Sequence, residues 1–449
     1  MKTKNLLSSQ TALWISIATF AGLLIYILSF DWMSPTGFWE YRRTTTMGTG
    51  VIAFALMSLC MITAIRSKKL EKYWNGLDKM FHLHKWSAIF AFTWTIIHWV
   101  TERGVKLLAQ SQLVEFPPKV KPVHAESAGF SLQSLEEPAK IFGEYSFYIL
   151  IAFILCALLS KIPYSIFQKM HRFIAVLYIL FAFHSIVLMP QTWWSTPAAY
   201  LIVALAIMGT YGAISSLFKT HRKKHSHQAT VESIQTTETG IIDLTLKMND
   251  DKPFQYESGQ FAFIDFTPVE GSHPFTIAAV TPDGLRFAIK PSGDFTDKMT
   301  DLVQTGQTVV VEGPYGKFDF ETAQPRQIWV AGGIGIAPFI SQLQALAQKP
   351  EHNQSIDFWY STVTEEENNF PETLEELCEK ANVKLHRVIT NKDGYLDATK
   401  ITQKIGDDQL QQSSVWFCGP QKFGSSLKAA LTRLGLAKNN FHNELFCFR

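Results

Sequence analysis

Residues 1–218 consist largely of apolar runs that are long enough to cross a bilayer as helices. A span needs about 20 apolar residues, because an α-helix rises 1.5 Å per residue through a hydrocarbon layer of roughly 30 Å. Reading the sequence in windows of about this length gives six candidate spans, at 12–30, 47–65, 86–101, 143–160, 172–190 and 197–218. Residues 228–449 have ordinary globular composition instead. The first half is therefore predicted to be an all-α bundle of six transmembrane helices.

Lysine and arginine residues predict which ends of the spans face the cytoplasm. They gather before the first span and in alternate loops, at 66–85, 161–169 and 219–224. The positive-inside rule therefore places both termini in the cytoplasm, with the chain in a cell membrane of the bacterial inner-membrane kind. A formal net charge of +2 gives no reason to expect nucleic acid binding. The expected surroundings are the lipid bilayer, and no feature indicates an obligate protein partner.

Four histidines interrupt these apolar runs at matched depths. His84 and His98 are 14 residues apart in the third span, and His171 and His184 are 13 apart in the fifth. Each pair is separated by about 20 Å along its helix, and both helices run in the same direction. A polar ring in hydrocarbon costs several kcal/mol unless it has a partner. Four imidazoles at two levels suit two bis-histidine haems, bound through neutral ring nitrogens.

The angular positions of these rings fit less well. Fourteen residues return a side chain to within about 40° of its start, whereas thirteen leave it about 140° away. The fifth span is therefore expected either to contain a local distortion such as a π-bulge, or to present its two rings from different sides. His82 would lie about 160° from His98 and is the poorer ligand. His84 is therefore the predicted partner.

The soluble half contains two different patterns. From about residue 229, short alternating strands separated by turns predict a small antiparallel barrel. From 327, strands, glycine turns and helices alternate, which predicts a parallel, doubly wound α/β sheet. The expected domains are a membrane domain at 1–226, a barrel at 227–325 and an α/β domain at 326–449. The five cysteines form no CxxC or disulfide-like spacing.

Three stretches of the soluble half carry chemistry. "GGIGIAP" follows a strand and opens a helix, so its backbone can approach a pyrophosphate. "HPFTIAA", at 273–279, places an aromatic ring beside a hydroxyl at a strand end, as a flavin ring requires. "SGDFTDKM", at 292–299, places glycine and a hydroxyl at a helix start, which favours phosphate. Each is a weak signal alone, and their order and spacing make the set specific.

Taken together, these motifs resemble those of the ferredoxin–NADP reductase superfamily. The chain from about residue 40 to its end is similar to the NADPH oxidase and ferric reductase family, except for the loop at 102–142. The resemblance implies FAD, NADPH or NADH, and two b-type haems as cofactors. It assigns the haem iron to four residues with the family's own spacing: His84, His98, His171 and His184.

The resemblance also implies which residues contact the other cofactors. The flavin ring is assigned to the first motif, His273, Pro274, Phe275 and Thr276, and the FAD pyrophosphate to the second, Gly293, Asp294, Phe295 and Thr296. The loop that closes this site contains Gly313 of "EGPYG". The nicotinamide dinucleotide is assigned to Gly332, Gly333, Gly335, Pro338, Cys418, Gly419 and Pro420. Phe446 is expected to cover the flavin ring, and the residues implied in the chemistry are Thr276, Cys418 and Phe446.

The sequence departs from the family at two places. Related reductases often place an arginine after the "FWYS" strand, where this chain has Val363 and then 365–367, all glutamate. A carboxylate suits a ribose hydroxyl better than a phosphate, so NADH and NADPH both stay open, with Arg387 or Lys392 as candidate cations. Superoxide-forming members tend to have a histidine one turn beyond the outer ligand of the third span. Here that residue is Glu102, and the cations near the outer face are Arg103, Arg42 and Arg43.

The expected function is transmembrane electron transfer. Cytoplasmic NAD(P)H would reduce FAD, and two haems would carry electrons to an acceptor outside, either O2, giving superoxide, or ferric iron. Two alternatives remain open at this point. One is a membrane-anchored flavoreductase that serves a cytoplasmic or quinone acceptor, and the other is a haem subunit that relays electrons to a partner protein. No EF-hand loop is present, so calcium control is not expected.

Overall fold

The computed structural model describes residues 8–33, 35, 37–111, 116–117, 132–158, 164–249, 253–281, 284–348, 354–367 and 371–444. The chain forms two compact units. One contains Lys4–Leu70 and Lys79–His221, and the other contains mainly Arg222–Arg449 together with the short segment Glu71–Asp78.

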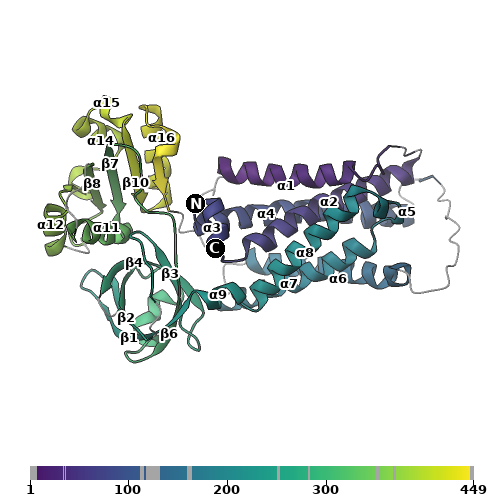
Figure 1. Ribbon diagram of the computed structural model, residues 1–449, viewed down its shortest axis with the longest axis horizontal. Helices are drawn as coiled ribbons and strands as arrows, with labels where there is room; N and C mark the ends of the chain where they lie inside the picture. Colours follow the sequence, from purple (N-terminus) through teal and green to yellow (C-terminus); the bar gives the residue numbers. More distant parts are fainter. Residues whose placement is uncertain are drawn as a thin grey trace. The chain divides into compact units, whose positions relative to one another are not determined.

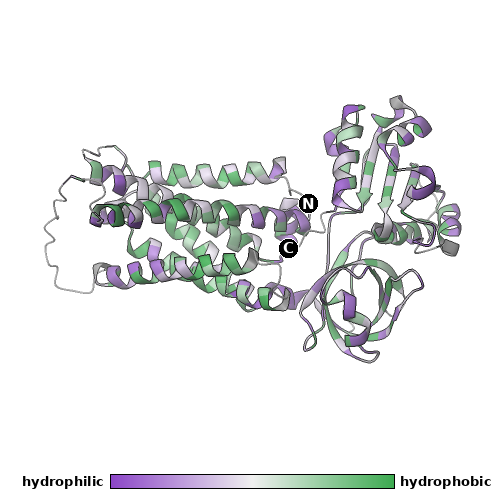
Figure 2. Cartoon of the chain, turned by 180° about the vertical axis from the view of Figure 1, so that it is seen from behind, coloured by the Kyte–Doolittle hydropathy of each residue, from purple (hydrophilic) through white to green (hydrophobic). Residues whose placement is uncertain are grey.

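Long helices make up the first unit (Figure 1). They are α1 (Ser9–Ile27), α2 (Phe38–Thr63), α4 (Leu77–Trp99), α6 (Glu136–Leu158), α7 (Tyr164–Val187) and α8 (Pro197–Leu217). Shorter helices lie between them: α3 (Lys68–Trp74), the π-helix η1 (Val100–Gly104), α5 (Val105–Gln110), and the 3₁₀ turns η2 (Leu132–Leu135) and η3 (Gln191–Ser195). Hydrophobic residues cover most of the length of the long helices (Figure 2).

Five of the described helices are long and apolar enough to cross a membrane: α1, α2, α6, α7 and α8. The chain is therefore a membrane protein. Helix α4, on the predicted third span, is 23 residues long but does not belong to this group. It carries Asp78, Lys79 and Lys85 in addition to three histidines, and these residues lower its apolar character.

A buried tyrosine joins the central helices of this unit. Tyr178 on α7 is 2% exposed, and its hydroxyl is 2.9 Å from Ser58 Oγ of α2 and donates to Leu205 O of α8 at 3.1 Å. Its ring stacks on Phe54, with the planes 7° apart. A Cβ at Gly209 would lie 1.9 Å from the hydroxyl oxygen, so only glycine leaves room here. These contacts fix α7 between α2 and α8.

An antiparallel barrel begins the second unit, after the short helix α9 (Thr220–Lys224). Its strands are β1 (Ser226–Thr236), β2 (Ile242–Met248), β3 (Phe261–Asp265), β4 (Ser272–Thr281), β5 (Gly284–Ile289) and β6 (Thr308–Tyr315). They close in the order β1-β2-β5-β4-β3-β6. Along β2, the side chains of Ile242, Leu244 and Leu246 alternate into the core. The turn η4 (Thr296–Lys298) and α10 (Met299–Leu302) follow β5.

A five-stranded parallel sheet completes the second unit. Its strands are β7 (Arg326–Gly332), β8 (Ser355–Thr362), β9 (Lys384–Ile389), β10 (Ser413–Cys418) and β11 (Phe441–Asn443), in the order β11-β10-β7-β8-β9. Its helices are η5 (Gly333–Ile336), α11 (Ala337–Gln348), α12 (Pro371–Lys380), α13 (Thr390–Asp393), α14 (Ala398–Ile405), α15 (Asp407–Leu410), α16 (Gln421–Arg433) and η6 (Lys438–Asn440). Separate apolar clusters cover its two faces, as in doubly wound folds.

The barrel and the parallel sheet are held together by polar contacts. Tyr256, beside the barrel, has its hydroxyl hydrogen-bonded to Ser341 on α11 and to the carbonyl of Ile277. Burial raises the pKa of Tyr256 to about 12, so the phenol stays neutral. The predicted fold class, apolar helices followed by an antiparallel barrel and a parallel α/β domain, is confirmed.

Candidate functional site

The four histidines of the apolar helices form two facing pairs. His84 on α4 faces His171 on α7, with ring centroids 5.9 Å apart and planes at 72°. His98 and His184, on the same two helices, have centroids 6.4 Å apart and planes at 86°. Two imidazoles that each place a nitrogen about 2 Å from one metal ion have centroids roughly 6 to 6.5 Å apart. Both pairs have the separation that a shared metal ion requires.

Helix α7 carries its two histidines without a break. It is a continuous α-helix from Tyr164 to Val187, which excludes the first of the two alternatives, a local distortion of the fifth span. The π-helical segment lies instead at Val100–Gly104, directly after α4. The spacing of 13 residues therefore fits the second alternative, which is that α7 presents His171 and His184 from different sides of its axis.

Hydrogen bonds to neighbouring helices orient three of these rings. In each case Nδ1 lies 2.9 Å from a backbone carbonyl oxygen, and the pairs are His84 with Cys60, His98 with Thr46 and His184 with Ala139. A carbonyl can only accept, so each Nδ1 carries the proton and each Nε2 keeps its lone pair. Histidines that bind metals usually make this second hydrogen bond. The sequence analysis did not identify these carbonyls.

Two glycines let the rings of His98 and His184, which we call the outer pair, pack closely against the backbone of neighbouring helices. Gly50 lies one helical turn after Thr46, and Gly143 lies one turn after Ala139. A Cβ at Gly143 would lie 2.2 Å from His184 Nδ1, and a Cβ at Gly50 would lie 3.0 Å from His98 Nδ1. The sequence analysis missed both residues, and the available signal was a glycine inside an apolar helix.

His82 belongs to neither pair. Its Nδ1 lies 2.9 Å from Thr11 Oγ1 on α1, and its Nε2 accepts from Trp86 Nε1 at 3.3 Å. Both ring nitrogens are therefore occupied, and the side chain ties α4 to α1. The assignment of His84, and not His82, as the inner ligand on α4 stays a prediction.

A cavity of about 1100 Å³ surrounds the outer pair. Its walls are mainly apolar and include Met47, Phe54, Trp99, Phe147, Phe181 and Ile202. Pockets for drug-sized ligands have volumes of roughly 300–1000 Å³, so a large planar group fits here. Among the described residues no group of three or more His, Cys, Asp or Glu side chains is placed to hold a metal ion.

The two predicted flavin motifs meet on the barrel. His273, Pro274, Phe275 and Thr276 lie on β4, and Thr276 pairs with Phe261 of β3. The ring of His273 stacks on Phe295 of the second motif, with centroids 4.8 Å apart. Phe275 is half-buried against the barrel core. The structure thus brings together two segments that were linked only by resemblance.

The second motif forms a tight turn before η4. The backbone N–H of Ser292 donates to Thr296 Oγ1 at 2.9 Å, and that of Gly293 donates to Asp297 Oδ1 at 3.3 Å. Gly293 has a φ of 151°, which favours glycine, and no atom lies within 4 Å of the position of a Cβ. Asp294 beside it is exposed. The turn leaves open space for a phosphate group at this edge of the barrel.

A buried carboxylate reaches the "EGPYG" loop that contains Gly313 of β6. Glu71, in the segment that packs with the barrel unit, is 5% exposed. It accepts from the backbone N–H of Gly316 at 2.6 Å and from that of Leu77 at 3.2 Å. Burial raises the pKa of Glu71 although both hydrogen bonds oppose the shift. The sequence analysis missed this residue, whose only signal was one of two acids, with Asp78, in the basic run at 66–85.

The motifs assigned to the nicotinamide dinucleotide meet at the carboxyl ends of neighbouring strands. Gly332 ends β7 and Gly333 follows it, and Gly419 and Pro420 follow β10, its parallel neighbour. A Cβ at Gly332 would lie 2.8 Å from Pro420 Cδ, so glycine is needed for the two segments to pack. Dinucleotides bind at this edge of doubly wound sheets.

Close packing also explains Gly335 and Cys418. A Cβ at Gly335 would lie 2.3 Å from the carbonyl oxygen of Cys418, and Pro338 begins α11 in the same turn. Burial raises the pKa of the Cys418 thiol well above its usual range, so this thiol is protonated at neutral pH. Phe446 lies outside the described residues.

Both cations proposed for a 2′-phosphate are engaged by carboxylates. Lys392 forms an ion pair with Glu365, and Arg387 Nη2 lies 2.5 Å from Glu375 Oε1. Glu367 accepts from the backbone N–H of Val363 at 3.1 Å, which closes the loop after β8. The region after β8 is therefore rich in carboxylates, and both candidate cations already form ion pairs with carboxylates.

Three family descriptions cover most of the chain. Residues 49–182 match the ferric reductase like transmembrane component, 226–319 match an FAD-binding domain, and 329–428 match an oxidoreductase NAD-binding domain. The chain has the domains of a ferric reductase-type flavoprotein. Its membrane part and its reductase part thus correspond to known oxidoreductase modules.

Individual relatives of this ferric reductase-type chain match part of its length. Flavohemoprotein A of Dictyostelium discoideum is 29% identical over 158 residues, which are 35% of this chain and 39% of that protein. The electron transfer component of anthranilate 1,2-dioxygenase from Acinetobacter baylyi is 24% identical over 230 residues, which are 48% of this chain and 65% of that protein. The chain therefore spans less than two thirds of the length of these relatives.

Solved structures show similar, distant matches. The FAD/NAD-binding domain of nitric oxide dioxygenase from Vibrio cholerae has a TM-score of 0.43 and 18% identity, covering 49% of this chain and 98% of that one. Flavohemoglobin from Malassezia yamatoensis has a TM-score of 0.47 and 16% identity, covering 89% and 98%.

Proposed function

We propose that this chain is a transmembrane oxidoreductase that takes electrons from NAD(P)H at the cytoplasmic face and delivers them singly to an acceptor at the opposite face. One observation carries the proposal, namely the two facing histidine pairs in the apolar helices, with ring centroids 5.9 and 6.4 Å apart. A flavin reductase that served a soluble acceptor would need neither pair.

The pairs fit b-type haem better than a bare metal ion. His84 with His171 would hold one haem iron, and His98 with His184 would hold the other. Two protein ligands would suffice for each iron, because the porphyrin would supply the remaining donors. The cavity beside the outer pair has room for such a macrocycle. When bound, FAD accepts two electrons as hydride from nicotinamide, and each haem carries one electron at a time.

The chain's own residues hold and orient these groups. The carbonyls of Cys60, Thr46 and Ala139 keep the proton on Nδ1 of their histidines, so that Nε2 keeps its lone pair and would bind iron as a neutral ligand. Apolar walls exclude water from the outer pair. Gly332 and Gly335 bring the dinucleotide turn against the end of β10.

The proposal includes six spans, with both termini in the cytoplasm of a cell that has a bacterial-type inner membrane. Helix α4 would be the sixth span. Its polar character is consistent with this role, because ionisable residues within membrane helices mark functional sites. The basic residues after α8, which include Arg222, Lys223 and Lys224, favour a cytoplasmic position for the reductase domains.

NADH is the electron donor that the site favours. A 2′-phosphate needs a free cation, and both candidate cations near β8 and β9 are paired with glutamates. A ribose hydroxyl, by contrast, can donate to a carboxylate, and the loop after β8 supplies several.

An absorption spectrum of the purified chain in lipid nanodiscs tests the proposed function. We expect a b-type Soret band, a haem-to-flavin ratio of about two, and reduction of this band by NADH without oxygen. The variants His98→Leu and His184→Leu should keep FAD and lose reduction of an impermeant outer acceptor. Unchanged acceptor reduction in both variants would favour a flavoreductase, and activity that requires an added protein would favour a relay subunit.

A further inference from the structure

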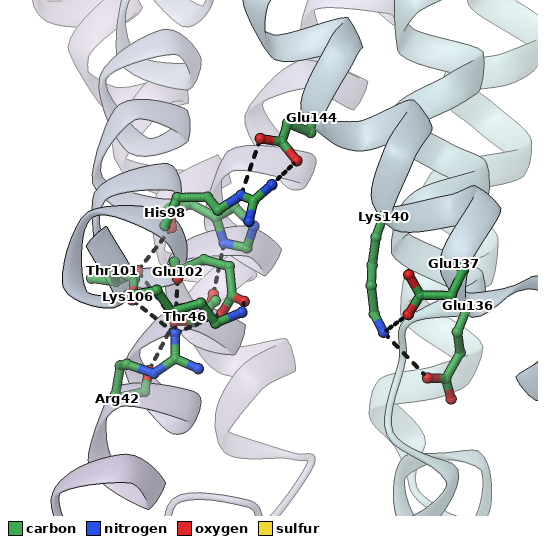
Figure 3. Close-up of polar contacts among 11 residues, drawn as sticks. Arg42, Thr46, His98, Thr101, Glu102, Lys106, Glu136, Glu137, Lys140 and Glu144 are labelled. Carbon is green, nitrogen blue, oxygen red and sulfur yellow. Dashed lines mark hydrogen bonds and ion pairs between the residues drawn. The ribbon is translucent and has the colours of Figure 1, made fainter. Parts of the chain in front are cut away.

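Charged side chains from the segment after α4 and from the start of α6 line one part of the cavity around His98 and His184, and Figure 3 draws them with their polar contacts. We call these residues the outer rim. Its cations are Arg42, Arg103, Lys106 and Lys140, and its carboxylates are Glu102, Glu136, Glu137 and Glu144. All of them except Arg42 line the cavity that contains His98 and His184, and Arg42 lies behind Glu102.

Each charge of the outer rim is paired with an opposite charge. Glu102 binds both Arg42, with Nη1 2.9 Å from Oε2, and Lys106. The Nζ atom of Lys140 lies 2.7 Å from Glu137 and 3.7 Å from Glu136. Four cations and four carboxylates sum to zero, so the described part of the outer rim is electrically neutral.

The ion pair between Arg103 and Glu144 connects the two sides of the outer rim. Arg103, on η1, makes two hydrogen bonds to Glu144 on α6: one from Nε at 3.0 Å and one from Nη2. Glu144 also accepts from Tyr148 Oη at 3.0 Å. The side chains of Arg103 and Glu144 are 48% and 27% exposed, so both are accessible to an approaching molecule. Of the rim pairs, this one connects the segment after His98 with α6.

Behind the outer rim the cavity becomes apolar. Trp99 stacks on Phe147, with ring centroids 5.4 Å apart and planes at 22°, and both rings line the cavity. A molecule that approaches the outer pair therefore passes a neutral rim and then enters an apolar space. A charged molecule loses hydration along this path and finds no unpaired partner among the described rim residues, whereas an uncharged one loses little.

From this arrangement we propose that the outer site selects uncharged one-electron acceptors, dioxygen or a quinone, over anionic ferric chelates and hydrated metal cations. The pair Arg103–Glu144 sets this selectivity by balancing the charge at the outer rim. The inference rests on the proposed function and names its acceptor class. For each NAD(P)H oxidised to NAD(P)⁺ and a proton, two acceptor molecules gain one electron each.

Variants that change the charge of the outer rim in opposite directions test the inference. Glu144→Gln makes the outer rim more positive by one unit, Arg103→Gln makes it more negative, and the double variant restores neutrality. The probes are ferricyanide as anion, hexaammineruthenium(III) as cation, and dioxygen and benzoquinone as uncharged acceptors. Arg286→Gln is the matched control, because it breaks the exposed pair with Asp243 on the barrel and changes the total charge equally.

We expect the wild-type rates with both ionic probes to depend weakly on salt. One uncompensated charge about 10 Å from a trivalent ion should change the ratio of ferricyanide to hexaammineruthenium rates in opposite directions in the two single variants. Each rate should shift roughly fivefold at 10 mM ionic strength and about twofold at 0.15 M. The double variant should return to the wild-type ratio, and Arg286→Gln should leave it unchanged.

Three results would overturn the inference. They are a wild-type ferricyanide rate that rises steeply as salt is removed, a shift of both single variants in the same direction, or a higher kcat/KM for ferricyanide than for both uncharged acceptors. Superoxide formation in air and benzoquinone reduction without oxygen distinguish the two uncharged acceptors. Failure of the proposed function is visible separately, because the haem band would then not be reduced by NADH or NADPH in the absence of any acceptor.

Discussion

The position of single atoms decides how the outer histidines are held. Nδ1 of His98 donates to the carbonyl oxygen of Thr46, and Nδ1 of His184 donates to that of Ala139. Each ring also packs against the glycine that lies one helical turn after that carbonyl. The spacing of the histidines along the chain predicted their pairing. The carbonyls and glycines could not be predicted, because the rotation of α2 and α6 about their axes is set by packing between distant segments and not by hydrophobic period.

Gly143→Ala tests the importance of this close approach. Alanine gains about 1 kcal/mol in helix propensity, but its Cβ would lie 2.2 Å from His184 Nδ1, and overpacking costs about 1–3 kcal/mol. We therefore expect displacement of His184 and a haem-to-flavin ratio that falls by about half, measured as pyridine haemochrome per FAD. Gly104→Ala is the control, because its Cβ would make only an ordinary contact of 3.4 Å. A full haem content in Gly143→Ala would contradict this role.

The loop after β8 gives a second prediction at the residue scale. Glu365→Gln removes the partner of Lys392 and leaves its ammonium free for a 2′-phosphate. An exposed ion pair contributes at most about 1 kcal/mol, so kcat/KM for NADPH should rise by no more than about fivefold while that for NADH changes little. Steady-state rates with both dinucleotides measure the ratio. An unchanged ratio would show that Lys392 lies away from the adenosine ribose.

At the scale of elements, local pattern predicted most of the fold. Alternation of apolar residues predicted strands such as Ile242–Met248, and apolar length predicted helices such as Pro197–Leu217. The prediction was incomplete where one element depends on another. A 13-residue spacing left two alternatives for the fifth span, a local distortion or rings presented from different sides, and the regular helix α7 excludes the first. The rim pair Arg103–Glu144 joins segments 41 residues apart and had no local signal.

The segment around α3 gives a pH-dependent prediction. Burial raises the pKa of Glu71 in the folded chain, so this group stabilises the fold fully below its unfolded pKa of about 4.3 and loses that contribution as pH rises through the folded pKa. Glu71→Gln cannot titrate, and its amide oxygen can still accept from Gly316. The Tm of the wild type relative to that of the variant should therefore decrease from pH 4.5 to pH 8.

Thermal unfolding in nanodiscs at several pH values measures this difference. Glu238→Gln serves as the control, because Glu238 is exposed and its replacement should leave the pH profile unchanged. A difference between wild type and Glu71→Gln that stays constant across this pH range would contradict the burial argument.

At the scale of the whole molecule, two histidine levels on one pair of helices imply an order of electron transfer. The inner level, His84 with His171, and the outer level, His98 with His184, are separated by about 20 Å along each helix. If electrons enter from the cytoplasmic reductase, loss of the outer level should leave the inner haem reducible. Loss of the inner level should isolate the outer haem, because transfer rates fall steeply with distance.

Anaerobic stopped-flow reduction by NADH of His184→Leu and His171→Leu tests this order. Each variant should retain about half of the haem and all of the FAD. In His184→Leu the remaining haem should be reduced at the wild-type rate, whereas in His171→Leu it should be reduced far more slowly, although dithionite reduces both fully. Equal rates in the two variants would mean that both levels exchange electrons with the flavin independently, and the sequential path would then be excluded. The expected asymmetry follows from the matched depths of the histidines and from the proposed entry of electrons at the cytoplasmic side.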